Sequence, residues 1–450
     1  MKQTTILLIF LLSIITGCKR EQGKDKSGQP LRPNILIIFT DDQGYADLGC
    51  FGSTKNLTPR MDQMASEGSM FTSFYAQAVC GPSRSVLLTG RYRSLSKGWA
   101  MPPEEITFAE LIKEVGYQTA CIGKWDVSSR EAIIDMMPNA QGFDYYFGPL
   151  GANDHGPTEG VPIHQNNHAI DTIYDMSVFT RLYTDKAIEY MQKKRDPEKP
   201  FVLYLAHTMM HTIIDASLAF RGTSEGGLYG DVVEEFDFET GRLLDSLETM
   251  GLSNSTLVIY TTDNGPWCQP SYTMQKEGHP KGAVFWGDPG PFRAGKGSVY
   301  EGGMRVPCIV RWPGKVPSNR VSDAIFATLD FMPTFARLTG YEIPSDRVID
   351  GIDQTDLLLG KSEQGSRDHF VYEYSTGKVG AIRKGKWKLL FPGRKPEKTH
   401  LWVRDYGTNN YELYDLESDP SEENNLVEKY PNIVEEIKEM AEIHRKNHRY

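Results

Sequence analysis

Asn34-Ile-Leu-Ile-Ile-Phe-Thr-Asp-Asp42 is an unbroken apolar run that ends in two carboxylates. Such a run is typical of a strand buried on both faces of a parallel sheet. Comparable apolar runs recur at residues 118–122, 201–206, 256–261 and 308–312. Between them, apolar residues repeat every three or four positions, which predicts helices over residues 107–115 and 231–250. The alternation predicts an α/β fold in which helices sandwich a mostly parallel sheet.

The composition is that of a large globular protein. The chain has 450 residues, of which 39% are hydrophobic and 24% charged, so it can bury a sizeable core. Lys and Arg total 49 against 59 Asp and Glu, a net charge of −10 with no basic block, which excludes a nucleic-acid partner. The 6 cysteines are scattered without a CxxC pair, which excludes a disulfide scaffold and a structural zinc site.

The sequence changes character after residue 362. Three segments are typical of antiparallel strands, and a closing helix is predicted over residues 431–440; the strand segments are 370–374, 380–391 and 411–416. We therefore expect a main domain at 33–362 and a small C-terminal α+β subdomain with an antiparallel sheet at 363–450. The Gly-rich, aromatic residues 263–305 predict long loops, which in compact domains usually carry function.

Residues 1–17 form a short apolar run after Lys2 and are interpreted as a secretory signal peptide. Ile15-Thr-Gly-Cys18 resembles a bacterial lipobox, which implies lipidation of Cys18 and a lipid-anchored tether over residues 18–32. The alternative is an ordinary cleavage site with an incidental cysteine. We expect an exported lipoprotein of the bacterial cell envelope, anchored to the membrane by its lipid. Lys19 is not the acidic residue of a surface-export signal, which favours the periplasmic face of the outer membrane.

Polar side chains follow two of the predicted strands. Asp41 and Asp42 come after the first, and Asp263 and Asn264 after residues 256–261. Because ligands gather beyond the carboxyl ends of strands in such sheets, the four side chains can meet and hold a divalent cation. An all-oxygen set favours Ca²⁺ over Mg²⁺. The alternative is that they cap helices or form Asx turns.

Two histidine pairs with a spacing of four offer a rival metal site: His207 with His211, and His164 with His168. This spacing places two imidazoles on one face of a helix, as zinc requires. His207 directly follows an apolar strand run, where the pair would be separated, so we do not expect zinc.

Cys80-Gly-Pro-Ser-Arg-Ser-Val-Leu-Leu-Thr-Gly90 resembles the type I sulfatase signature, C-x-P-S-R followed by an apolar stretch and Thr-Gly. The resemblance extends over most of the chain through Gly123-Lys-Trp125, Gly142-Phe-Asp144, Gly227-Leu-Tyr-Gly-Asp231, Asp263-Asn-Gly265, Gly295-Lys-Gly297, Glu301-Gly-Gly-Met-Arg-Val-Pro307 and Glu412-Leu-Tyr-Asp-Leu416. The chain is thus similar to the formylglycine-dependent sulfatases, whose fold is alkaline-phosphatase-like, and residues 33–362 would be the catalytic domain.

The resemblance implies a modified nucleophile. Cys80 would be oxidised to formylglycine (3-oxoalanine) by a formylglycine-generating or sulfatase-maturating enzyme before export. Its hydrate would attack sulfur, next to a cation held by Cys80 together with Asp41, Asp42, Asp263 and Asn264.

The resemblance also assigns the surrounding residues. Arg84 would hold the hydrated aldehyde, Lys124 and Lys296 would bind the sulfate, and His211 would lie near the leaving oxygen. Pro82-Ser83-Arg84 is expected to open a helix whose N-terminal dipole favours an anion. For any one of these residues the alternative is a solvated lysine or a buried structural histidine.

The sequence departs from the family pattern at two places. Asp126 stands where the family has a histidine, so a carboxylate must be protonated, paired with a lysine or turned toward a sugar hydroxyl to avoid repelling sulfate. Residues 152–157 read Ala-Asn-Asp-His-Gly-Pro, where some relatives have Ser-His before the Asp. We expect Asp126 and His155 to contact substrate, with Asn153 or His155 as replacement donors.

We therefore expect a sulfuric ester hydrolase that removes sulfate from a sulfated carbohydrate. Five aromatic residues can either stack on sugar rings or belong to the core: Trp99, Tyr145, Tyr146, Trp267 and Trp286. A local basic pocket for a polyanion can draw on Arg91, Arg93, Lys97, Arg293 and Arg305. The alternatives are a formylglycine-dependent phosphate or phosphonate ester hydrolase, and a catalytically silent carbohydrate-binding relative.

Overall fold

The computed structural model describes residues 30–154, 156–268, 286–393 and 407–448. Its centre is an 11-stranded sheet. In spatial order the strands are β10 (Arg320–Ser322), β2 (Ser69–Tyr75), β9 (Arg305–Arg311), β8 (Thr256–Thr262), β1 (Asn34–Thr40), β7 (Phe201–Ala206), β3 (Gln118–Gly123), β4 (Tyr145–Gly148), β5 (Val161–Gln165) and β6 (His168–Ile173), with β11 (Phe326–Ala327) paired to β2.

The middle of the sheet is parallel, as the sequence predicts. β1 pairs with β8 and β7, placing Ile37 opposite Ile259 and Tyr204, and β7 pairs in parallel with β3. The last predicted strand begins earlier than expected, at Arg305, and β9 runs antiparallel to both β8 and β2. After β8 a long loop leads back to the same end of the sheet, where the chain enters β9 next to β8 and runs in the opposite direction.

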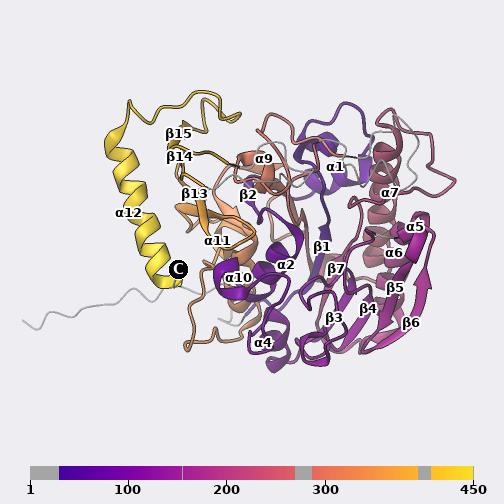
Figure 1. Cartoon of the computed structure of the whole chain (residues 1–450). Helices are drawn as coiled ribbons and strands as arrows, with labels where there is room; N and C mark the ends of the chain where they lie inside the picture. The colour runs from indigo at the N-terminus through magenta and orange to yellow at the C-terminus, as the bar shows by residue number, and fades with distance from the viewer. Residues whose placement is uncertain (1–29, 155, 269–285, 394–406, 449–450) are drawn as a thin grey trace, which may run out of the picture.

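Helices cover both faces of the sheet (Figure 1). Their bounds are α1 (Pro59–Ser66), α2 (Cys80–Thr89), α3 (Arg93–Ser96), α4 (Phe108–Glu114), α5 (Gly156–Glu159), α6 (Phe179–Glu189), α7 (Gly227–Thr249), α9 (Glu301–Met304), α10 (Phe331–Thr339), α11 (Thr355–Leu358) and α12 (Pro431–His448). The predicted helices at 107–115 and 231–250 correspond to α4 and α7.

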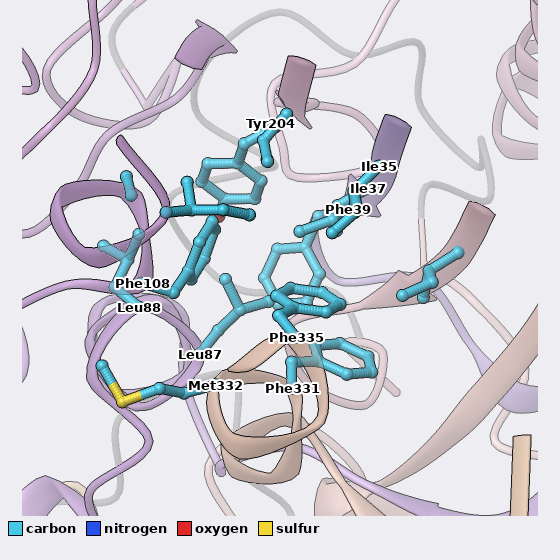
Figure 2. Close-up of a cluster of buried hydrophobic side chains, with 14 of the residues drawn as sticks. Ile35, Ile37, Phe39, Leu87, Leu88, Phe108, Tyr204, Phe331, Met332 and Phe335 are labelled. Carbon is cyan, nitrogen blue, oxygen red and sulfur yellow. The ribbon is translucent and has the colours of Figure 1, made fainter. Parts of the chain in front are cut away.

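Alternate residues of β1 bury themselves on opposite faces. Ile35, Ile37 and Phe39 pack with residues of α2, α4 and α10 (Figure 2). Leu36 and Ile38 pack with residues of α1, α6 and α7. Because side chains of a strand alternate between its faces, an uninterrupted apolar run is what a strand between two helical layers requires.

The C-terminal part forms a separate four-stranded antiparallel sheet in the order β12 (His369–Glu373), β13 (Val379–Lys384), β14 (Trp387–Leu390) and β15 (Glu412–Asp415). The segment predicted at 380–391 is a hairpin whose turn includes Gly385 with a φ of 54°. α12 packs on this sheet and continues to His448, beyond the predicted helix end. No helix within the described residues is both long enough and apolar enough to span a bilayer.

A fully buried charge cluster joins the two sheets. Lys388 of β14 lies with its Nζ 2.9 Å from Glu301 Oε1 and 2.8 Å from Glu422 Oε1. Glu301 also accepts a hydrogen bond of 2.8 Å from the hydroxyl of Tyr75 on β2. Burial raises the pKa of Glu422 to about 7, against the opposing charge of Lys388.

We expect Lys388→Met to lower the free energy of unfolding by about 3–5 kcal/mol, because it leaves Glu422 buried without its cation and Glu301 with only the more distant Arg305. Denaturant unfolding of the purified protein measures this change. Lys386→Met, which removes a neighbouring exposed lysine paired with Asp415, is the control and should have a much smaller effect. Equal effects of the two substitutions would contradict this account of the cluster.

Candidate active site

The site lies at the carboxyl ends of four adjacent strands. Asp41 follows β1, Asp263 follows β8 and Lys124 follows β3, while β7 leads into the loop that carries His211. These strands are neighbours in the order β8, β1, β7, β3, so residues more than two hundred positions apart meet at one edge.

Cys80 is the first residue of α2, and its side chain is buried. The Sγ atom lies 3.2 Å from Asp41 Oδ1 and 3.2 Å from Lys296 Nζ. Burial, together with the charges of Asp263 and Asp41, raises the pKa of this thiol well above its usual value, so an unmodified Cys80 stays protonated. The neighbouring Gly81 is required, since a Cβ there would lie 2.2 Å from Cδ1 of Trp99.

Two buried cations hold the carboxylates beneath Cys80. Arg84, one turn further along α2, lies 2.8 Å from Asp263 Oδ2 and 3.2 Å from Asp41 Oδ2. Lys124 Nζ lies 2.6 Å from the same Asp41 oxygen. Burial raises the pKa of Asp41, but Lys124 and the other cations outweigh it and hold the pKa well below the usual value. Burial and the charge of Asp41 raise the pKa of Asp263 to about 7.

The donor set fits a divalent cation. One ligand atom from each of Asp41, Asp42, Cys80 and Asp263 lies within 4.8 Å of all the others. Asn264 is buried, and its Oδ1 makes no hydrogen bond to any described residue, while its Nδ2 donates to Asp42 Oδ1 at 2.7 Å. A buried carbonyl oxygen without a donor costs free energy unless a cation or water satisfies it. The oxygen ligands suit Ca²⁺ or Mg²⁺.

Lys296 and His211 complete the surroundings of Cys80. Lys296 Nζ lies 2.6 Å from Asp42 Oδ1, and the indole N–H of Trp267 donates to Asp42. The backbone N–H of Lys296 donates to Pro266 O at 2.8 Å, which fixes its loop to the strand end. His211 Nε2 lies 3.7 Å from Asp42 Oδ2, and its Nδ1 lies 2.5 Å from the carbonyl of Thr212, which orients the ring.

The histidine pairs considered for zinc are separated. His207 Nδ1 accepts a hydrogen bond from the backbone N–H of Met209, and its ring packs edge-on against Tyr183 and Phe236. Burial lowers the pKa of His207 to about 3, which keeps it neutral. His164 is buried on β5, whereas His168 is exposed on β6. Of the histidines among the described residues, only His211 shares a possible metal cluster with Cys80.

The structure places the residues at the two departures from the family pattern in different surroundings. Asp126 is fully buried, 3.4 Å from Lys124 Nζ, and pairs with Arg130. Asn153 Nδ2 donates hydrogen bonds to the carbonyls of His211 and Ile213, at 3.2 and 2.5 Å. Both of its N–H groups are therefore in use, and it is not a replacement donor for sulfate. His155 lies outside the described residues.

Most of the basic residues proposed for a polyanion pocket are engaged elsewhere. Arg91 pairs with Glu105, Arg293 Nη1 donates to the carbonyl of Glu422, and Arg305 pairs with Glu301. Lys97 Nζ donates to the carbonyl of Ser94. These basic side chains therefore mainly stabilise contacts within the protein and are not free to form a pocket for a polyanion.

The aromatic candidates also divide. Tyr145 and Tyr146 are core residues of β4. Trp267 is hydrogen-bonded to Asp42, and Trp286 is half-buried. Trp99 is also half-buried and lies against Gly81, next to Cys80. Trp99 is thus the aromatic residue of this set that is both next to Cys80 and partly exposed.

Three residues of the site were missed by the sequence analysis. Arg130 and Asp154 form an ion pair beside Lys124 and His211, and the hydroxyl of Tyr204 on β7 lies 3.4 Å from Arg84 Nη1. Residues 124–130 are not helical, so the four-residue spacing of Asp126 and Arg130 gave no signal for the first. Nothing in the sequence indicates the contacts of Asp154 and Tyr204, which depend on tertiary packing.

Comparison with known proteins identifies the family of this chain. The sulfatase family profile matches residues 33–341, and the profile of the N-sulphoglucosamine sulphohydrolase C-terminal region matches residues 292–447. The N-acetylgalactosamine-6-O-sulfatase of Bacteroides thetaiotaomicron is 30% identical, over 98% of this chain and 99% of its own length. The N-acetylgalactosamine-6-sulfatase of Canis lupus familiaris is 34% identical, over 82% of this chain and 73% of its own.

A solved structure has a similar fold. A Bacteroides thetaiotaomicron protein, solved in work on that organism's metabolism of multiple glycosaminoglycans, superposes with a TM-score of 0.82 at 29% identity, covering 92% of this chain and all of its own. The alkaline-phosphatase-like fold, with buried cations and carboxylates at the sheet edge, defines a hydrolase of anionic esters. The chain belongs to the sulfatase family and is a sulfuric ester hydrolase.

Proposed function

We propose that this enzyme removes sulfate from a sulfated sugar, with the sulfate held over Cys80 by Lys124 and Lys296. The observation that carries the proposal is the position of Cys80, buried at the N-terminus of α2 between Asp41 and Lys296, each 3.2 Å from its Sγ. The sugar is supported by the relatives above, which are named for sulfate on N-acetylgalactosamine.

The charge balance of the site supports a bound cation. Arg84, Lys124 and Lys296 are buried among the carboxylates of Asp41, Asp42, Asp126 and Asp263. With these charges alone, a sulfate would enter a region without positive excess. A Ca²⁺ held by Asp41, Asp42, Asp263 and Asn264 would reverse the balance, and formylglycine at position 80 would supply an oxygen nucleophile.

The chain's own residues then have separate tasks. Arg84 fixes Asp41 and Asp263, so the carboxylates are held in place before substrate binds. Lys124 and Lys296 donate to the sulfuryl oxygens, on which negative charge accumulates. His211, with Nδ1 held by the carbonyl of Thr212, faces the leaving oxygen with Nε2, which has a proton to give only when both ring nitrogens are protonated. The N-terminal N–H groups of α2 also favour an anion at Cys80.

The alternative reactions are separated by one comparison. We expect kcat/KM for a sulfate monoester to exceed that for the matching phosphate monoester, because the site is proposed to stabilise the charge of a sulfuryl group. Both esters of the same sugar are assayed with matured enzyme. A higher kcat/KM on phosphate would favour the phosphate or phosphonate ester hydrolase, and sugar binding without release of either anion would favour the silent binding protein.

The proposal includes export. Residues 1–17 as a signal peptide and Cys18 as a lipid attachment site support a lipoprotein of the cell envelope on the periplasmic face of the outer membrane, but both segments lie outside the described residues. The partner for maturation is a formylglycine-generating or sulfatase-maturating enzyme, which would act on Cys80 before the chain folds and buries it. Labelling of Cys18 with a fatty acid analogue, absent in Cys18→Ala, tests the anchor.

A further inference from the structure

A second group of charged side chains lies next to the cluster around Cys80. Arg130 bridges two carboxylates on different loops: its Nε donates to Asp126 Oδ1 at 2.8 Å, and its Nη1 donates to Asp154 Oδ2 at 2.7 Å. Asp126 is completely buried, whereas the side chains of Arg130 and Asp154 are 42% and 34% exposed. The group therefore runs from the interior to the surface.

This group touches the proposed sulfate site at two points. Asp126 Oδ2 lies 3.4 Å from Lys124 Nζ, and Asp154 Oδ1 lies 3.7 Å from His211 Nε2. Lys124 is proposed to bind the sulfate, and His211 to face the oxygen that joins sulfate to the sugar. Arg130 and Asp154, the exposed members, therefore lie where the sugar next to that oxygen must be placed.

The pair is held rigidly. Asn153 fixes the loop of Asp154 to the carbonyl of His211, and the backbone N–H of Ser129 donates to the carbonyl of Trp99 at 2.7 Å. Asp126, Ser129 and Arg130 have φ angles of 59°, 56° and 61°, a region that residues other than glycine rarely adopt. The surrounding contacts must maintain this backbone, and the hydrogen bonds to Asp126 and Asp154 place the guanidinium.

The chemistry of the pair suits hydroxyl groups. Nη2 of Arg130 makes no hydrogen bond to any described residue, so a donor remains next to the carboxylate of Asp154. Two carboxylates already outnumber the one guanidinium, so a second sulfate or a uronate carboxylate would gain little there and would be repelled by Asp154. A hydroxyl can donate to Asp154 and accept from Arg130 at the same time.

We propose that Arg130 and Asp154 bind hydroxyl groups of the sugar beside the sulfate ester, and that Asp126 is a positioning residue that holds Arg130. The inference rests on the proposed function, since it requires a sugar sulfate in the site. It makes the Arg130–Asp154 pair a determinant of which sugar is accepted and leaves the binding of sulfate to Lys124 and Lys296.

The test compares two substrates of the matured enzyme: N-acetylgalactosamine 6-sulfate, and an aryl sulfate that has no sugar hydroxyls. The measured quantity is kcat/KM for the sugar sulfate divided by kcat/KM for the aryl sulfate. We expect Arg130→Ala to lower this ratio by about tenfold or more, because only the sugar has hydroxyl groups that bond to the guanidinium. Asp154→Asn, which keeps the side-chain shape, should lower the ratio in the same direction. Arg181→Ala, an exposed arginine on α6 paired with Asp185, is the matched control and should leave the ratio unchanged.

Asp126→Asn tests the positioning role separately. We expect it to raise KM for the sugar sulfate more than it lowers kcat, since the hydrogen bond that anchors Arg130 loses the carboxylate charge while the sulfate ligands remain. An unchanged ratio in both Arg130→Ala and Asp154→Asn, or an equal loss on both substrates, would overturn the inference. Wild-type enzyme that cleaves the aryl sulfate but no sugar sulfate would instead refute the sugar substrate of the proposed function.

Discussion

Cys80→Ala is expected to lower sulfatase activity by about 10⁴-fold or more, because it removes the side chain from which the nucleophile is proposed to be made. The fold should survive, since Cys80 contributes a small side chain at the first turn of α2. Activity on a sugar sulfate and far-UV circular dichroism are measured on protein matured in the same way as the wild type.

Cys50→Ala provides the control for this experiment. Cys50 is also unpaired and partly buried, but it belongs to a short helical turn outside the cluster. We expect this variant to keep the wild-type rate. A folded Cys80→Ala protein with more than a small fraction of the wild-type rate would show that another group attacks the ester.

Asp42→Ala is expected to lower activity by about 10³-fold, and chelation of the wild-type protein should lower it to a similar level. Asp42 offers its carboxylate to the proposed cation and also pairs with Lys296, so its removal takes a metal ligand and releases a sulfate-binding lysine. A cation in the site is worth several kcal/mol of transition-state stabilisation, which accounts for the size of the effect.

Restoration by metal separates these two causes. Ca²⁺ should restore the chelated wild-type enzyme, and do so better than Mg²⁺, but should not restore Asp42→Ala. Asp245→Asn, at an exposed aspartate on α7 that pairs with Arg60, is the control and should respond to chelation as the wild type does. Full activity of the wild type after exhaustive chelation would exclude a catalytic cation.

The parts of the fold that the sequence predicted are those determined by local pattern. The run from Asn34 to Phe39 predicted a doubly buried strand, and its position between two helical layers is confirmed. The antiparallel direction of β9 could not be predicted, because an apolar run looks the same in either direction. The division at residue 362 stays a prediction.

The site divides in the same way. Asp41 and Asp263 could be expected to meet, because both follow strands of one parallel sheet. The use of Arg293 and Arg305 in loop contacts, and the bridge of Arg130 to Asp154, depend on which side chains tertiary packing brings together. Composition identifies the charges, but only the packed structure says which of them remain for substrate.

The most direct test of the central claim is peptide mass spectrometry over residues 77–91 of active, matured enzyme. If Cys80 is the source of the nucleophile, the peptide will have exchanged its sulfur for oxygen and lost two hydrogens, and the extent of conversion will track specific activity across preparations. An active preparation in which this peptide carries an intact thiol throughout would contradict the account.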